Sequence, residues 1–201
     1  MDLIHNFPNR VPTLETKRLT LRAFTLEDAP RVAELAGDKR ISDSTLLIPY
    51  PYTLEDAIGW IETHPERAIR GEGYSFALTL KTGELMGGFG LNTNLEHARA
   101  EIGYWLGLPY WNGGYTTEAA RAILNWGFEN LALERIQAHV FAGNTGSIRV
   151  QEKLGMTLEG RMKKYYRKDG AFLDVELRSV LLEDWRGNYT TEKATALNSD
   201  V

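Results

Sequence analysis

The sequence contains no cysteine, which excludes disulfide bonds, thiolate metal ligands and a cysteine nucleophile. It has no run of about 18 apolar residues and no basic, apolar leader at its start, so it predicts neither a membrane span nor a secretory signal. The four histidines are scattered, and no two have the i, i+4 spacing of a helical ligand pair. We therefore expect a soluble, cytoplasmic protein without a metal.

Long runs of positive charge are also absent. No five consecutive residues are Lys or Arg, and the 201-residue chain has a formal net charge of −4. This balance argues against a nucleic-acid partner or a polybasic membrane anchor, and it suits a cationic or neutral substrate. With 43% hydrophobic residues, the chain is long enough for one compact domain and too short for two ordinary ones.

The hydrophobic pattern predicts an α+β fold. Apolar alternation predicts a first strand at 18–23, and two segments that begin like capping boxes predict helices at about 25–37 and from 53 onward. Further strands are expected at 75–80, 84–91, 99–106, 135–141, 157–164 and 172–182, with helices at 117–130 and 144–154. We place the single domain at 11–182, between an N-terminal extension, 1–10, and a polar C-terminal tail, 183–201, whose end beyond Trp185 is expected to fray.

A glycine pair, Gly113 and Gly114, stands directly before the helix expected at 117–130. Backbone N–H groups at such a helix start can converge on an anion, aided by the helix dipole, and phosphate is the expected guest. A plain tight turn is the alternative. The surrounding residues fit neither a Walker loop nor a dinucleotide-binding fingerprint.

About 30 residues later, Asn144-Thr145-Gly146-Ser147 opens a helix that ends in Glu152-Lys153-Leu154-Gly155-Met156. With the loop 111–116, this order resembles the GNAT superfamily of N-acetyltransferases. The segments 15–22, 100–104, 115–119 and 158–160 narrow the resemblance to the RimJ/RimL-like branch.

The resemblance implies a mixed, mostly antiparallel sheet of six to seven strands, with helices on both faces and a splayed parallel strand pair, 101–106 and 135–141. It implies acetyl-CoA as cosubstrate, its pyrophosphate on the loop and its pantetheine between the splayed strands. The expected contacts are Trp105, Leu106, Leu108, Trp111, Asn112, Gly113, Gly114, Tyr115, Thr116, Asn144, Ser147 and Lys153. Trp105 and Leu106 are alternatively core residues.

The loop departs from the family pattern Gln/Arg-x-x-Gly-x-Gly/Ala at both ends, where Trp111 and Thr116 stand. Its backbone donors survive both changes, so we still expect anion binding. The Thr116 hydroxyl would contact phosphate or cap the helix, and capping is favoured.

Transfer to an amine needs a base, oxyanion stabilisation and a proton for the departing thiolate. Glu101 is the candidate base, with substrate orientation or an ion pair to an arginine as alternatives. The other glutamate position used in RimL-like proteins holds Tyr166 here. Ser147, three residues after the expected cap Asn144, is the candidate acid, because Gln151 stands where many relatives have a tyrosine. An ordinary first-turn serine is the alternative.

The acceptor follows from the cost of making a neutral amine. At pH 7.5 deprotonation costs about 4 kcal/mol for a lysine but about 0.7 kcal/mol for an α-amine. We therefore expect a protein N-terminal α-amine, as in the ribosomal-protein branch, and expect 42–52 and 165–166 to wall its pocket. A small-molecule amine, or a non-catalytic acyl-CoA-binding module, is the alternative. RimL-like proteins are often dimers, so a homodimer is one expected assembly.

Overall fold

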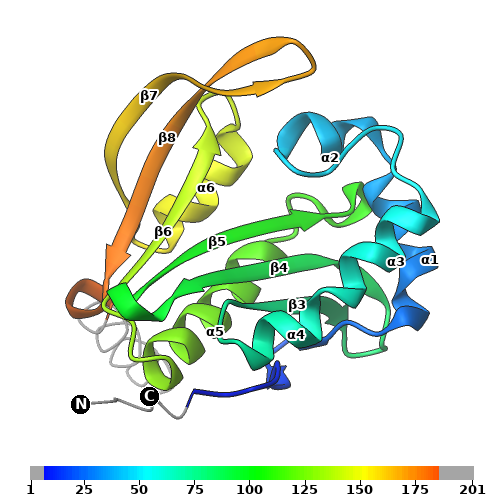
Figure 1. Cartoon of the computed structure of the whole chain (residues 1–201), viewed down its shortest axis with the longest axis horizontal. Coiled ribbons are helices and arrows are strands. Elements are labelled where there is room, and N and C mark those ends of the chain that lie inside the picture. Colours follow the sequence, from blue (N-terminus) through cyan, green and yellow to red (C-terminus); the bar gives the residue numbers. More distant parts are fainter. Residues whose placement is uncertain (1–6, 186–201) are drawn as a thin grey trace, which may run out of the picture.

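The computed structural model describes residues 7–185 and contains one eight-stranded sheet in the order β1-β2-β3-β4-β5-β6-β8-β7 (Figure 1). The strands are β1 (Leu14–Glu15), β2 (Leu19–Ala23), β3 (Gly73–Leu80), β4 (Leu85–Asn94), β5 (Arg99–Leu106), β6 (Arg135–Phe141), β7 (Thr157–Lys168) and β8 (Ala171–Leu181). The helices are α1 (Ala29–Ala36), α2 (Lys39–Ser44), α3 (Leu54–Glu62), α4 (His64–Ile69), α5 (Tyr115–Asn130) and α6 (Thr145–Lys153).

The sheet is antiparallel except between β5 and β6, which run parallel. That parallel pairing spans only the three residue pairs from Arg99↔Arg135 to Glu101↔Gln137, whereas β6 pairs with β8 along its whole length. Beyond Glu101 the two parallel strands diverge, as Figure 1 shows. The mixed α+β fold and its splayed pair are as predicted, but the sheet has eight strands rather than the six to seven expected, because the short β1 pairs with β2 at its edge.

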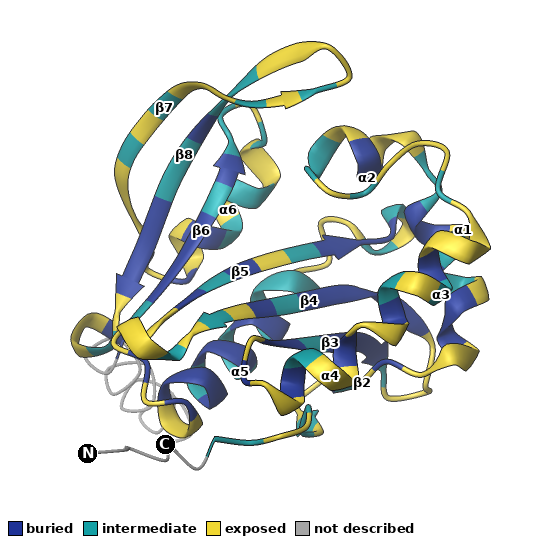
Figure 2. Ribbon diagram, viewed as in Figure 1, coloured by how far each residue is buried: buried dark blue, intermediate teal, exposed yellow. Residues whose placement is uncertain are grey.

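Two hydrophobic clusters pack on opposite faces of the sheet, because strand side chains alternate between the faces. On one face, the buried rings of Tyr74 and Phe76 meet Trp126 of α5 edge-on, with centroids 4.8 and 5.6 Å apart. On the other, Phe24 and Trp105 pack beneath α1 and α3. Figure 2 shows the resulting buried stripe along the central strands. Helices therefore cover both faces, as expected.

Both predicted capping boxes are present. The Asp28 carboxylate accepts from the Thr25 N–H at 2.9 Å, and the Asp56 carboxylate accepts from the Thr53 N–H at 2.8 Å. These contacts depend only on neighbours three residues apart, which explains why the sequence predicts them well.

Several elements differ from the expected ones. The two-residue strand β1 and the short helices α2 and α4 were not expected, α5 begins two residues earlier, and β7 extends to Lys168. No helix within residues 7–185 is long and apolar enough to cross a membrane. The tail beyond Trp185 and most of the expected N-terminal extension lie outside the described residues.

Candidate active site

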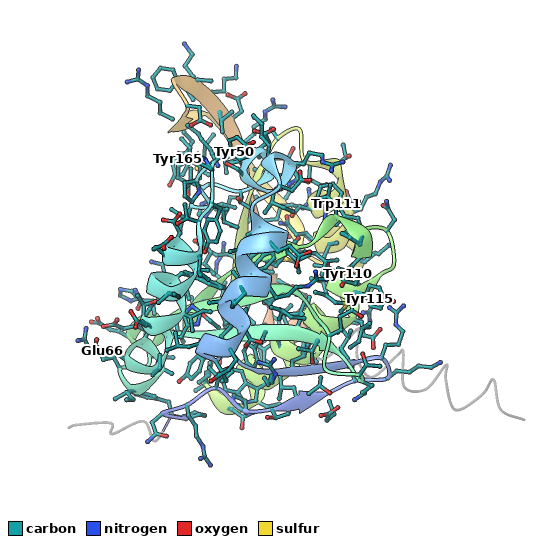
Figure 3. The ribbon with its side chains drawn as sticks, turned by 90° about the vertical axis from the view of Figure 1, so that its right-hand side faces the viewer. Tyr50, Glu66, Tyr110, Trp111, Tyr115 and Tyr165 are labelled. Carbon is teal, nitrogen blue, oxygen red and sulfur yellow. The ribbon has the colours of Figure 1, made fainter. Side chains whose placement is uncertain are left out.

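A cavity of about 940 Å³ lies where β5 and β6 diverge, and residues from both faces of β5 line it. Its walls come from both splayed strands, the start of α5, helix α6 and the loop after α2. Figure 3 places Trp111 and Tyr115 on one side of the molecule, and Tyr50 and Tyr165 at the top on the other side. The cavity thus links the glycine loop to the segments predicted to wall an acceptor pocket.

The glycine loop ends in a helix start without a side-chain cap. Gly114 is the N-cap of α5, its φ of +74° suits glycine, and no side chain of the described residues accepts from the first turn. The first-turn N–H groups are therefore available to an anion. A Cβ at Gly113 would lie 2.6 Å from the Tyr115 ring, so this position also needs glycine.

The favoured role of Thr116 as the helix cap was wrong. Thr116 is the second residue of α5, inside the helix, because Gly114 adopts the left-handed conformation two residues earlier and starts the helix there. The Thr116 side chain lines the cavity instead.

Contacts with distant residues hold the loop in place. The indole N–H of Trp111 donates to the Leu106 carbonyl at 2.6 Å, which ties the loop to the end of β5. The Arg18 guanidinium donates to the Gly113 carbonyl at 2.9 Å and pairs with Glu118 at 2.6 Å.

Ten of the twelve predicted contact residues line the cavity, namely Trp105, Leu106, Trp111, Asn112, Gly114, Tyr115, Thr116, Asn144, Ser147 and Lys153. Leu108 instead packs against the cluster under α1 and α3, and the Gly113 carbonyl is held by Arg18.

Asn144 caps α6 as predicted. Its Oδ1 accepts from the Ser147 N–H at 3.0 Å, while its Nδ2 donates to the Ser44 carbonyl at 3.4 Å. Asn144 thus connects α6 to the end of α2, which lies across the cavity.

The Ser147 hydroxyl lies between two polar groups. The Tyr104 hydroxyl lies 2.7 Å from the Ser147 Oγ, and Gln151 Nε2 donates to that oxygen at 3.5 Å. Burial raises the pKa of Tyr104, so the phenol stays protonated near neutral pH. Tyr104 of β5 therefore brings a tyrosine hydroxyl to the site, although α6 carries Gln151 where many relatives have a tyrosine. Sequence reasoning missed Tyr104, although it stands one residue beyond Gly103 on the face opposite Glu101.

Glu101 is paired with a histidine rather than with an arginine. Its Oε1 lies 2.9 Å from His139 Nδ1, and its Oε2 accepts from Gln137 Nε2 at 3.4 Å. The carboxylate keeps 38% of its side-chain surface exposed to the cavity. The His139 ring stacks on Tyr165, with centroids 5.7 Å apart. Sequence reasoning missed His139; its signal was alternation with Gln137 on the strand parallel to the one carrying Glu101.

The loop after α2 forms one wall of the cavity, and a lysine of β7 holds it. The Lys168 ammonium donates to the carbonyls of Ser42, Thr45 and Ile48 at 2.6, 2.5 and 3.0 Å. Burial lowers the pKa of Lys168. Residues 44–49, together with Tyr52 and Tyr166, line the cavity, as expected of acceptor-pocket walls.

On the face of the sheet that carries Glu101, the strand residues beside it have very small side chains, and we call this surface the floor of the cavity. Gly103 of β5 lies opposite Gly90 of β4, which lies opposite Ser75 of β3. A Cβ at Gly103 would meet no atom within 4 Å. The small residues leave room for a substrate beside the carboxylate.

Comparisons with known proteins agree with this geometry. A sequence model of the acetyltransferase (GNAT) domain family matches residues 18–157. The N-acetyltransferase p20 of Bacillus licheniformis is 33% identical over 177 residues, covering 87% of this chain and 99% of p20. The crystal structure of a GNAT-family acetyltransferase from Bacillus anthracis superposes with a TM-score of 0.76 at 28% identity, covering 86% of this chain and 99% of that one. RimL, an α-N-protein acetyltransferase of ribosomal L7/L12 solved with coenzyme A, shares the fold with a TM-score of 0.80 at 20% identity, covering 86% and 99%.

Proposed function

Because this chain belongs to the GNAT family of acetyltransferases, it is an acetyl-CoA-dependent N-acetyltransferase, and we propose that its acceptor is the α-amine of a protein N-terminus. The observation that supports acetyl transfer at this site is that polar side chains lie on both faces of β5 where β5 and β6 diverge. Glu101 lies on one face of β5, and Tyr104 with Ser147 lies on the other. The acceptor amine can therefore lose a proton to Glu101 on one side of the acetyl carbon, while the departing sulfur receives a proton from Ser147 on the other side.

The glycine loop fits the pyrophosphate of acetyl-CoA. The uncapped first turn of α5 offers backbone donors to an anion, and Arg18 and Trp111 fix the loop around it. The exposed Lys153 at the end of α6 lines the same cavity and adds positive charge. The unpaired stretch of β5 beyond Glu101 leaves room for the pantetheine arm. When bound, acetyl-CoA supplies the activated acetyl group.

On the amine side, Glu101 accepts a proton from the acceptor nitrogen as that nitrogen bonds to the acetyl carbon. Gln137 donates to the carboxylate at 3.4 Å and His139 Nδ1 lies 2.9 Å from it without hydrogen-bond geometry, and the carboxylate surface left exposed faces the cavity. The first-turn position of Ser147 places its hydroxyl near the positive end of the α6 dipole.

On the thiol side, Ser147 donates its proton to sulfur as the C–S bond breaks and its electron pair moves to sulfur. A serine oxygen has two lone pairs and one hydrogen. The Tyr104 hydroxyl is within reach of both the Ser147 Oγ, at 2.7 Å, and the Ser147 carbonyl, at 3.3 Å. When Tyr104 and Gln151 both donate to the Ser147 oxygen, its two lone pairs are filled and its hydrogen is free to reach sulfur.

The acceptor assignment rests on the cost of deprotonation and on the open, glycine-lined floor. An α-amine needs only a weak base at neutral pH. The fold also resembles that of RimL, which is described as an α-N-protein acetyltransferase. A small amine is the second candidate, since the cavity is not specific to a polypeptide.

The experiment is acetyl transfer from acetyl-CoA, read as thiol release and by mass spectrometry. The acceptors are a panel of short peptides with free α-amines, the same peptides blocked at the N-terminus but bearing lysine, and small primary amines. Transfer to free α-amines supports the proposal. Transfer confined to lysine or small amines contradicts the acceptor assignment, and tight acetyl-CoA binding without any transfer favours a non-catalytic binding module.

A further inference from the structure

One strand concentrates positive charge in this otherwise acidic chain. Five of the eight residues from Arg161 to Lys168 are Lys or Arg, although the chain has a net charge of −4. They lie on β7, in the hairpin that β7 forms with β8 and that extends beyond the end of β6 (Figure 1).

Two of these cations already have structural roles. Arg161 pairs with Asp174 at 3.2 Å, and Lys168 donates to carbonyls of the loop after α2. The other three, Lys163, Lys164 and Arg167, are exposed. Within residues 7–185 the charged group of none of these three forms an ion pair within 4 Å, although Lys163 is among the charges that lower the pKa of Asp174. We call these three residues the basic patch.

An exposed aromatic ring lies within the basic patch. Phe172 of β8 is 59% exposed, and the charged groups of Lys164 and Arg167 lie 6.0 and 5.8 Å from its ring centre. Two cations beside an exposed ring form a surface that can take both an acidic and an apolar side chain.

A bulge joins the basic patch to the acceptor side of the cavity. The β7–β8 register shifts between Met162 and Tyr166, and the Lys164 N–H donates to Asp174 at 2.9 Å with a φ of +53°. The bulge places Tyr165 on the ring of His139, which also contacts Tyr166 and Glu101. The stacked rings of Tyr165 and His139 therefore lie between the basic patch and the carboxylate of Glu101.

We propose that the basic patch binds acidic side chains of the polypeptide acceptor while the acceptor's N-terminus reaches Glu101. This inference rests on the proposed function and narrows its substrate class to N-termini followed by Asp or Glu. Arg167 directly follows Tyr166, which lines the cavity, and Lys163 lies three positions before Tyr166, so the whole patch lies within about 10 Å of that tyrosine along the chain. Acidic residues from about the fourth position onward would reach it. A small amine is too short to use this surface.

The test compares three peptides that share their first three residues and differ at positions four to eight, which are acidic, neutral or basic. Steady-state acetylation is measured at low and high salt for the wild type and for K163E/K164E. The matched control is R99E, an exposed cation at the far end of β5. We expect the wild type to show a KM about tenfold lower for the acidic than for the neutral peptide at low salt. The advantage should shrink at about 1 M salt, where the screening length is about 3 Å.

In K163E/K164E we expect the acidic peptide to lose its advantage and the basic peptide to gain one. The kcat and the KM for acetyl-CoA should stay unchanged, and R99E should behave like the wild type. Equal KM values for the three peptides, or an equal loss in R99E, would overturn the inference while leaving N-terminal acetylation intact. No transfer to any peptide would instead contradict the proposed function itself.

Discussion

Replacing Tyr104 by Phe removes one hydroxyl and leaves the ring, which stacks on Phe89 with centroids 5.2 Å apart. The hydroxyl lies 2.7 Å from the Ser147 Oγ. A neutral hydrogen bond of this kind contributes about 1 kcal/mol, which corresponds to about a fivefold change in rate. We expect Tyr104→Phe to lower kcat about fivefold and to leave the KM for acetyl-CoA unchanged, because the Ser147 hydrogen is no longer directed at sulfur.

A double-mutant cycle separates this orienting role from a general loss of packing. Ser147→Ala should lower kcat about a hundredfold, as expected when a general acid is lost. If Tyr104 acts through Ser147, the double variant should be no slower than Ser147→Ala alone, which is a coupling energy of about 1 kcal/mol.

The assay is initial-rate thiol release with a saturating peptide acceptor, supported by thermal unfolding of each variant. Equal melting temperatures for the wild type and Tyr104→Phe would show that the ring still packs. The reasoning is refuted if Tyr104→Phe still slows the Ser147→Ala enzyme about fivefold, since the two effects would then be independent.

Four other predictions follow from separate contacts. Glu101→Gln should lower kcat/KM for the peptide about a hundredfold, as expected when a general base is lost; a change of less than about twofold would exclude Glu101 as the base. Lys168→Met should raise the acceptor KM about fivefold without changing that for acetyl-CoA, because the loop after α2 loses three hydrogen bonds to the ammonium; parallel rises in both KM values would contradict this. Gly103→Val should leave the melting temperature unchanged but block bulky acceptors, because a Cβ there meets no atom within 4 Å. Gly87→Ala should destabilise the fold by about 1–3 kcal/mol, since its Cβ would collide with the Trp105 carbonyl oxygen. A lower melting temperature for Gly103→Val than for Gly87→Ala would show that the cavity wall at Gly103 is wrongly assigned. His64 has a pKa lowered to about 4 by burial and by Arg67, so the unfolded chain takes up a proton first and wild-type stability should fall from about pH 6.5 to 4; denaturant unfolding of His64→Leu should show a smaller fall over that range.

The sequence predicted those parts of the site that depend on near neighbours. Asn144 caps α6, the helix that carries Ser147. Gly114 is the last residue of the glycine loop before α5. Both depend on contacts within three or four residues, for which residue type is informative. Thr116 was misassigned because only the left-handed φ of Gly114 decides where the helix begins.

The parts that the sequence did not predict depend on strand register and on contacts across long separations. Tyr104 meets Ser147 across 43 residues, and Lys168 reaches the Ser42 carbonyl across 126. His139 reaches Glu101 because β5 and β6 pair in parallel at Glu101↔Gln137 before they diverge. A shift of one residue in either strand would place these side chains on the opposite face, and hydrophobic alternation alone does not determine that register.

The most direct test of the central claim is mass spectrometry of a free-N-terminal peptide after incubation with acetyl-CoA and the wild-type protein. The account predicts one acetyl group on the α-amine, one equivalent of coenzyme A thiol released for each peptide modified, and a rate about a hundredfold lower in Ser147→Ala. Acetyl-CoA bound tightly by the protein, with no acetyl group on the peptide or on any other amine, would contradict it.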